Sequence, residues 1–121
     1  MEPRPTPRRR WRDYTTQAGR RPVAEFIAQL SDGDAAAIVA AMKEISLDGL
    51  VAARHVRGDI YEVRADGAHA TYRILFALQG RHGHVLLALE AFSKKSKKTP
   101  ITSITLAQRR LADWQSKGRH S

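Results

Sequence analysis

The chain of 121 residues contains no cysteine, which excludes disulfide bonds and thiolate zinc sites and makes a reducing compartment compatible. It has no hydrophobic run close to the roughly 20 residues of a membrane-spanning helix. Its N-terminus is rich in arginine and proline, with no apolar segment behind it, so we do not expect a secretory signal. We therefore expect a cytoplasmic protein with no membrane partner.

Motifs of several enzyme classes are absent as well. The sequence has no glycine-rich phosphate loop, nucleophile elbow, paired-carboxylate motif or H-E-x-x-H metal motif. We therefore expect neither a cofactor nor a metal. For His55, His82 and His84, exposure to solvent is the simpler interpretation. Because histidine titrates near neutrality, one of them could still transfer a proton.

Acidic residues are scarce: 12 stand against 21 basic residues, for a formal net charge of +9. This balance favours a nucleic acid or an acidic protein as partner. The length fits one domain, and 42% hydrophobic residues suffice for a packed core. Residues 1–10 hold three prolines and four arginines and predict a flexible basic arm, either a solvated tail or an aid to RNA binding. The domain itself then spans residues 11–117.

The spacing of hydrophobic residues predicts the order of elements. Helical spacing predicts helices over residues 22–30, 35–48 and 101–115. A short strand within 11–16 comes first, and alternation with period two predicts strands over 60–65, 70–78 and 85–92. Asp34 and Thr99 are suited to cap the second and third helices. The predicted fold class is α+β, an antiparallel sheet with an N-terminal helical hairpin and a C-terminal helix.

Basic residues gather at the predicted strands. Arg64 ends one strand, and Arg73 lies within the next on the same face as Leu75. An arginine in so apolar a strand needs a reason, which is either a structural ion pair with Glu62 or Glu90 or a role in holding phosphate. Both interpretations stay open on the sequence.

A lysine run, K-K-S-K-K, follows the last predicted strand. Such runs are usually solvated surface, but this one also precedes a helix N-terminus, which adds positive potential. The functional interpretation is that these lysines contact a phosphate backbone. The lysines of the run are Lys94, Lys95, Lys97 and Lys98.

At four places the sequence resembles the HigB branch of the RelE-like toxins of bacterial and phage toxin–antitoxin pairs. The matching pieces are G-R-R-P-V-A-E-F-I, V-R-G-D-I-Y-E-V-R, Y-R-I-L-F and F-S-K-K-S-K-K-T-P-I, in this order. The likeness runs from about Trp11 to Trp114. It implies a compact RelE-like fold and the toxin of a type II pair, a ribosome-dependent mRNA endonuclease that inhibits translation. We expect this cleavage to need no metal.

The resemblance also implies partners. These are a cognate antitoxin, the ribosome with its mRNA, operator DNA reached through the antitoxin and, in some relatives, a dedicated chaperone.

Functional residues carry over by position. The resemblance implies functional roles for Arg73, Arg64, Lys94 and Lys95. We predict catalytic roles for Arg73, Arg64 and Lys95, and the lysine run predicts RNA binding by Lys94, Lys97 and Lys98. Glu62 and His55 are the candidates for general base. Glu62 stands where some relatives have lysine, and no tyrosine lies near Ile101 where others have one, so the base stays open. The alternative functions are a non-catalytic nucleic-acid-binding module and an operon co-repressor.

Overall fold

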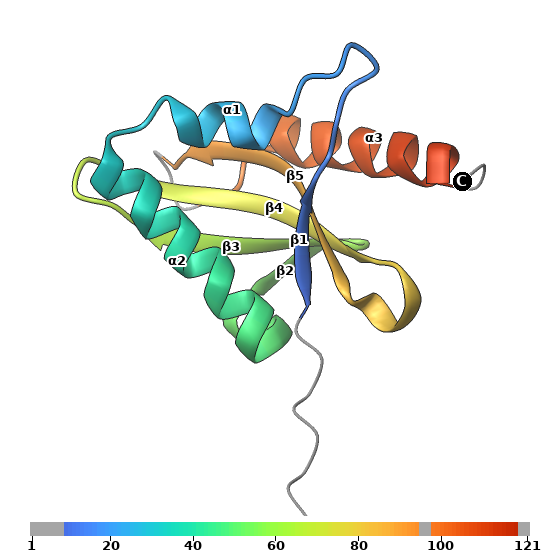
Figure 1. The fold of residues 1–121 in the computed structure, drawn as a ribbon, viewed down its shortest axis with the longest axis horizontal. Coiled ribbons are helices and arrows are strands. Elements are labelled where there is room, and N and C mark those ends of the chain that lie inside the picture. Colours follow the sequence, from blue (N-terminus) through green and yellow to red (C-terminus); the bar gives the residue numbers. More distant parts are fainter. Residues whose placement is uncertain (1–8, 95–97, 119–121) are drawn as a thin grey trace, which may run out of the picture.

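The computed structural model describes residues 9–94 and 98–118, which form a five-stranded sheet and three α-helices (Figure 1). The strands are β1 (Arg10–Asp13), β2 (Arg54–Arg57), β3 (Ile60–Asp66), β4 (Thr71–Gln79) and β5 (Val85–Ser93). The helices are α1 (Pro22–Ala28), α2 (Asp32–Asp48) and α3 (Ile101–Gly118), with short 3-10 turns η1 (Gly49–Ala52) and η2 (Arg81–Gly83). The predicted α+β class is confirmed.

The sheet is mixed, in the order β1-β5-β4-β3-β2. Strands β2 to β5 are antiparallel neighbours, as predicted for the last three strands. Strand β1 pairs with β5 in parallel, from Arg10 opposite Val85 to Asp13 opposite Ala88, so the expectation of a purely antiparallel sheet is wrong. After β1, the chain passes through α1 and α2 to β2 at the opposite edge of the sheet. Strands β3 and β4 then bring it back, so that β5 lies beside β1 and runs in the same direction.

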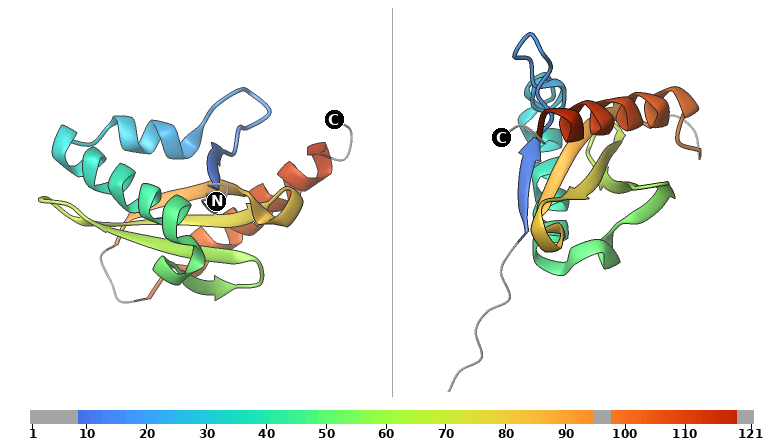
Figure 2. Two further views of the ribbon diagram at one scale, coloured as in Figure 1. Left: turned by 60° about the horizontal axis from the view of Figure 1, so that its bottom comes forward. Right: turned by 90° about the vertical axis from the view of Figure 1, so that its right-hand side faces the viewer.

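Helices α1 and α2 cover one face of the sheet and α3 covers the other (Figure 2). A hydrophobic core lies on each face. Tyr72, Ile74 and Phe76 of β4 face α1 and α2, and the alternate residues Leu75 and Ala77 face α3. Both sides of the central strands are therefore covered, which explains why β4 and β5 are apolar on both faces. Arg73 shares the face of Leu75, as predicted, and the structure shows that α3 covers this face.

Strand β1 contributes to both cores. The Trp11 ring packs edge-on against Phe76 at 5.1 Å on the α1–α2 side. Tyr14, just after the strand, is buried on the α3 side and donates its hydroxyl to Asp113 at 2.5 Å. The predicted packing of these two aromatic residues on the core is confirmed.

Helix α2 begins earlier than predicted, and Asp34 is not its cap. The Ser31 side chain caps the helix by accepting from the Asp34 N–H at 3.3 Å. Asp34 is buried and accepts from the Ala68 N–H at 2.7 Å and from the Tyr72 hydroxyl at 2.5 Å. A Cβ at Gly67 would lie 2.6 Å from this carboxyl group, so the close approach requires glycine. Asp34 thus fastens the β3–β4 turn to α2.

Helix α3 covers the other face. Ile104, Ala107 and Leu111 are its buried stripe. The helix begins at Ile101, so Pro100 occupies the N-cap position and the predicted cap, Thr99, lies outside it. The Thr99 hydroxyl instead donates to Glu62 at 2.7 Å.

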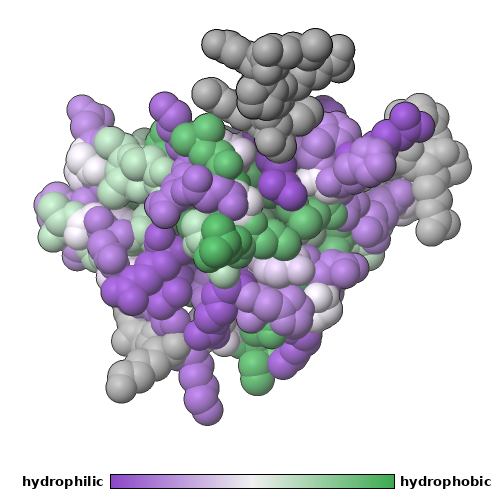
Figure 3. Space-filling view, turned by 90° about the horizontal axis from the view of Figure 1, so that it is seen from below, coloured by the Kyte–Doolittle hydropathy of each residue, from purple (hydrophilic) through white to green (hydrophobic). Residues whose placement is uncertain are grey.

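The surface is largely polar, with local hydrophobic exposure. In the described part of the chain, the large hydrophobic side chains with notable exposure are Val39, Leu47, Val51 and Ile101. Figure 3 shows a strip of hydrophobic surface across the middle of the face seen from below, bordered by hydrophilic side chains. Among the residues described, no helix has the length and hydrophobicity needed to cross a bilayer.

Candidate functional site

Arg64 and Arg73 face each other across the β3–β4 pair. Directly opposed residues project from the same face of an antiparallel sheet, here the α3 face. The Arg73 side chain is 12% exposed, whereas that of Arg64 is 57% exposed. The structure therefore brings together the two arginines that the sequence predicted, one held in the sheet and one reaching solvent.

Glu62 lies beneath this pair with a side chain that is 0% exposed. Its Oε2 atom lies 3.3 Å from Nη1 of Arg73 and 3.5 Å from Nε of Arg54, the residue opposite it on β2. Its Oε1 atom accepts from Thr99. The structural pairing of Arg73 with Glu62, considered on the sequence, is therefore present, because a buried carboxylate needs cations and donors around it.

Glu90, the other partner considered for Arg73, is engaged elsewhere. A register shift between Leu75 and Phe76 places Glu90 opposite Leu75. There Arg110 of α3 donates to Glu90 at 3.4 Å and to the Leu89 carbonyl oxygen at 2.7 Å. Glu90 and Arg110 therefore fasten α3 to β5 and leave Arg73 to Glu62.

Lys94 joins the cluster directly after β5. Its backbone N–H donates to the Thr71 carbonyl oxygen at 2.7 Å, which holds it beside the start of β4. Its pKa is lowered, chiefly by burial and then by the charge of Arg73, with smaller contributions from Arg54 and Arg64. Glu62 opposes the shift. The Lys94 ammonium group therefore lies in the field of three arginines, which disfavours its charged form.

Arg64 has a weaker partner of its own. Its Nε donates to Asp66 at 2.9 Å, and this hydrogen bond is the main reason why the pKa of Asp66 is lowered. Both side chains are more than half exposed. Exposed pairs of this kind contribute about 0–1 kcal/mol, so Arg64 can exchange Asp66 for a phosphate at little cost.

The remaining predicted residues divide into three groups. Lys95 and Lys97 lie outside the described residues. Lys98 is exposed and lies shortly before α3. His55 is not brought to the site: it projects from β2 on the face opposite to Arg54, packs against Tyr61 at 5.3 Å, and places Nε2 2.7 Å from the Gly58 carbonyl oxygen.

Sequence reasoning missed Arg54 and Thr99. Arg54 belongs to β2, whose segment R-H-V-R has one hydrophobic residue and so no alternation to detect. The available signal was its place before the Gly58 turn, from which a hairpin partner for residues 60–65 could have been proposed. Thr99 was noticed only as a helix cap.

The cluster can bind an anion. Four cations, Arg54, Arg64, Arg73 and Lys94, face two carboxylates, Glu62 and Asp66. Arginine forks and lysine ammonium groups bind phosphate oxygens, and a partly buried setting strengthens the attraction. The described residues include no group of three or more potential side-chain ligands placed to hold a metal ion.

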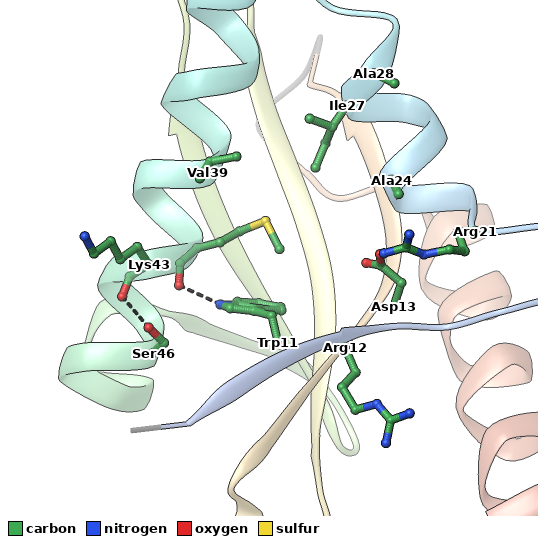
Figure 4. Close-up of a pocket in the computed structure, with 11 residues that line it drawn as sticks. Trp11, Arg12, Asp13, Arg21, Ala24, Ile27, Ala28, Val39, Lys43 and Ser46 are labelled. Carbon is green, nitrogen blue, oxygen red and sulfur yellow. Dashed lines mark hydrogen bonds and ion pairs between the residues drawn. The ribbon is translucent and has the colours of Figure 1, made fainter. Parts of the chain in front are cut away.

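A separate groove of about 680 Å³ lies between α1, α2 and β1, on the opposite face of the sheet (Figure 4). Ile27 and Val39 project toward it from the two helices, and Trp11 lies at its base, where its indole N–H donates to the Met42 carbonyl oxygen at 2.6 Å. Its ionic side chains include the paired Asp13 and Arg21. Arg12 and Lys43 also line the groove, whose exposed lining is otherwise mainly apolar.

Comparison with known proteins gives consistent matches. Residues 25–112 match the family described as phage derived protein Gp49-like (DUF891). The chain is 35% identical over 109 residues to a protein named probable endoribonuclease HigB1 from Mycobacterium tuberculosis strain CDC 1551 / Oshkosh. The same figures hold for the protein of that name from strain ATCC 25618 / H37Rv, with 87% of this chain and 84% of the relative covered.

Proposed function

We propose that this chain cuts translated mRNA on the ribosome. It belongs to the phage-derived Gp49-like family and is a HigB-type toxin with mRNA endonuclease activity. Toxin and endonuclease follow from the family and from the 35% identity to its relatives. Ribosome dependence is the further step. The observation that carries the proposal is the cluster of Arg54, Arg64, Arg73 and Lys94 on one face of the sheet.

We also propose that the fold is the RelE-like arrangement, with α1 and α2 as its N-terminal helical hairpin. Its support is the order of elements: a first strand, two helices on one face, then an antiparallel hairpin series and a closing helix on the other face. The domain would then span residues 11–117, although β1 already begins at Arg10.

The proposed reaction is attack by the RNA 2′-hydroxyl on the adjacent phosphate. The bond from the 2′-oxygen to phosphorus forms and the bond to the 5′-oxygen breaks, while the 2′-hydroxyl loses a proton and the leaving oxygen gains one. Arg73 and Arg64 would stabilise the charge that grows on the phosphate, and Arg54 would add a third guanidinium group. We assign Lys95, predicted as a catalytic residue, to protonation of the leaving oxygen, and Lys97 and Lys98 to binding of the RNA backbone.

Lys94 is the described residue best placed to accept the proton. Burial and the neighbouring arginines lower its pKa, so its neutral, basic form is reached at lower pH than in an ordinary lysine. Glu62, an earlier candidate, is fully buried with both oxygens engaged. His55, the other candidate, lies on the opposite face of the sheet. Lys94→Arg, which keeps the charge but cannot act as a base, should bind the ribosome and cleave slowly.

Dependence on the ribosome fits a site with few acid–base groups. Holding reactants in the right geometry can lower a barrier by roughly 7–11 kcal/mol. A ribosome that already fixes the message would supply much of this orientation. We therefore expect little cleavage of free RNA and cuts phased with codons during translation in the cytoplasm.

Family membership supports a cognate antitoxin as a partner. We further propose contact with operator DNA through that antitoxin, and the family leaves room for a dedicated chaperone. A net charge of +9 suits acidic partners and ribosomal RNA alike.

One observation favours a second candidate, a non-catalytic nucleic-acid-binding module or co-repressor. The Glu62 ion pair accounts for the presence of Arg73 in the strand without any chemistry. A binding module would use the same cations to hold phosphate and would leave the RNA intact.

Induced expression followed by mapping of mRNA 5′ ends separates the two functions. An endonuclease produces new ends at fixed positions within codons, and these ends should become much less abundant in the Lys94→Arg variant. Stable binding of ribosomes or RNA without new ends would support the module and contradict the proposed activity.

A further inference from the structure

We propose that Glu62 is a positioning residue, which together with Thr99 holds Arg73 and Arg54 in the orientation that the phosphate requires. The inference rests on the proposed role of Arg73 in stabilising the phosphate. It assigns Glu62 no contact with RNA and no proton transfer.

The first step is the division of labour between the two oxygens of Glu62. Oε2 faces the guanidinium groups of Arg73 and Arg54, and Oε1 accepts from Thr99. With the side chain fully buried, neither oxygen is available to a proton of the substrate. The carboxylate is therefore equipped to orient its neighbours.

The second step is where those neighbours come from. Arg54 belongs to β2, Arg73 to β4 and Thr99 to the segment that leads into α3. These three parts of the chain meet at one carboxylate on β3. Lys94 is fixed separately, through its backbone bond to Thr71. Glu62 is thus the point where the arginines are aligned with the start of α3.

The third step is the state of Arg73. Its Nη1 reaches Glu62, while its Nε is buried and has no hydrogen-bond partner among the described residues. A guanidinium group placed only to satisfy its donors would not leave one unpaired, since a buried unpaired donor is costly. Among the described residues, the side-chain hydrogen bond of the Arg73 guanidinium group is the one to Glu62, so this contact sets its orientation.

The test uses the full-length toxin and ribosomes programmed with a reporter message, in single-turnover reactions over a range of ribosome concentrations. Glu62→Gln is nearly isosteric and keeps an acceptor for Thr99. We expect its maximal cleavage rate to fall on the order of 10²-fold, the cost of a misplaced catalytic group, with half-saturation nearly unchanged. A wild-type rate in a folded Glu62→Gln protein would overturn the inference.

Arg73→Ala and the double variant Arg73→Ala/Glu62→Gln provide the decisive comparison. If Glu62 acts mainly through Arg73, adding Glu62→Gln to Arg73→Ala should slow cleavage far less than the roughly 10²-fold expected in the wild-type background, and what loss is left should come through Arg54. An equal loss in both backgrounds would overturn the inference. A wild-type rate for Arg73→Ala would instead refute the proposed role of Arg73, and no cleavage by the wild-type protein would refute the proposed function, so these failures are distinguishable.

Thr99 supplies an independent pair of variants should Glu62→Gln fold poorly. Thr99→Val keeps the shape and removes the donor, whereas Thr99→Ser keeps the donor. We expect Thr99→Val to slow cleavage roughly 10-fold, within the range set by small misplacements, and Thr99→Ser to recover most of the rate. Equal rates for the two variants would contradict the role of the Thr99 hydroxyl.

Discussion

Two carboxylates are buried on opposite faces of the same sheet, and their partners differ. Asp34, on the α1–α2 face, is held by the Tyr72 hydroxyl, by backbone N–H groups and by the His69 ring at 3.3 Å. Glu62, on the α3 face, is held by Arg54, Arg73 and Thr99. A hydroxyl or a backbone N–H has one donor, which Asp34 uses up, whereas a guanidinium group has several donors and can bind a second acceptor. Asp34 therefore fastens a turn, and Glu62 organises a surface that can receive an anion.

Replacing Arg73 should produce the largest effect. Removing one donor that stabilises transition-state charge typically costs about 10²–10³ in rate, so Arg73→Ala should lose growth arrest and cleavage. The same change leaves buried Glu62 short of a partner, which costs on the order of 3 kcal/mol in the free energy of unfolding. Arg73→Ala/Glu62→Gln should recover stability in urea unfolding and remain inactive. Recovery of cleavage in the double variant would contradict the assignment of Arg73.

Replacing Asp34 should do the opposite, lowering stability and sparing chemistry. Asp34→Asn weakens the hydrogen bonds to Tyr72 and the β3–β4 turn, and we expect the Tm to fall by roughly 5–10 °C. The rate per folded molecule should be unchanged. Tyr72→Phe, which removes one of these bonds, is the matched control and should show a smaller fall in thermal unfolding. A large loss of cleavage at a temperature where the variant is folded would contradict the purely structural role of Asp34.

The pH dependence of stability should sharpen the same contrast. The pKa of Asp34 is lowered from its ordinary value of 3.8, mainly by the Tyr72 hydrogen bond. A carboxyl group with a lowered pKa contributes stability above its unfolded pKa and loses it as the pH falls through the folded pKa. The difference in stability between wild type and Asp34→Asn should therefore be constant near neutrality and shrink below about pH 4. Unfolding midpoints measured from pH 7 to pH 3 test this; a constant difference down to pH 3 would contradict it.

Arg54 should have the smallest effect. If Arg54, Arg64, Arg73 and Lys94 each neutralise one phosphate of a single strand, the logarithm of affinity should fall with the logarithm of salt concentration at a slope of about −3. Arg54→Ala should reduce the slope by about 0.7, whereas Arg21→Ala, on the other face, should leave it unchanged. Equal slopes for Arg54→Ala and wild type would contradict the assignment of Arg54 to the phosphate-binding site.

The sequence was most informative where one local period decided the structure. The period of two located β3, β4 and β5, and it placed Arg73 on the face opposite to Ile74. It did not locate β2, because Arg54 and Arg57 flank a segment with a single hydrophobic residue. It also could not show that β1 pairs with β5 in parallel, since period two is the same for either direction.

The candidate site divides in the same way. The convergence of Arg64 and Arg73 could be predicted, because a hairpin with known alternation brings such residues together. The burial of Glu62 and its contact with Thr99 depend on how α3 lies over the sheet, which no local pattern encodes. For the same reason, Glu62 was considered as a proton acceptor before its surroundings were known.

The parallel pairing of β1 with β5 also sets an order of assembly. It joins residues at the front of the chain to partners more than 70 positions later, Arg10 with Val85 and Asp13 with Ala88. A nascent chain leaving the ribosome cannot form this pair until β5 has emerged, and contacts of such high sequence separation form late in folding. Strand β1, including Trp11, therefore has no strand to pair with during most of synthesis. This interval is when the cognate antitoxin has its earliest opportunity to bind.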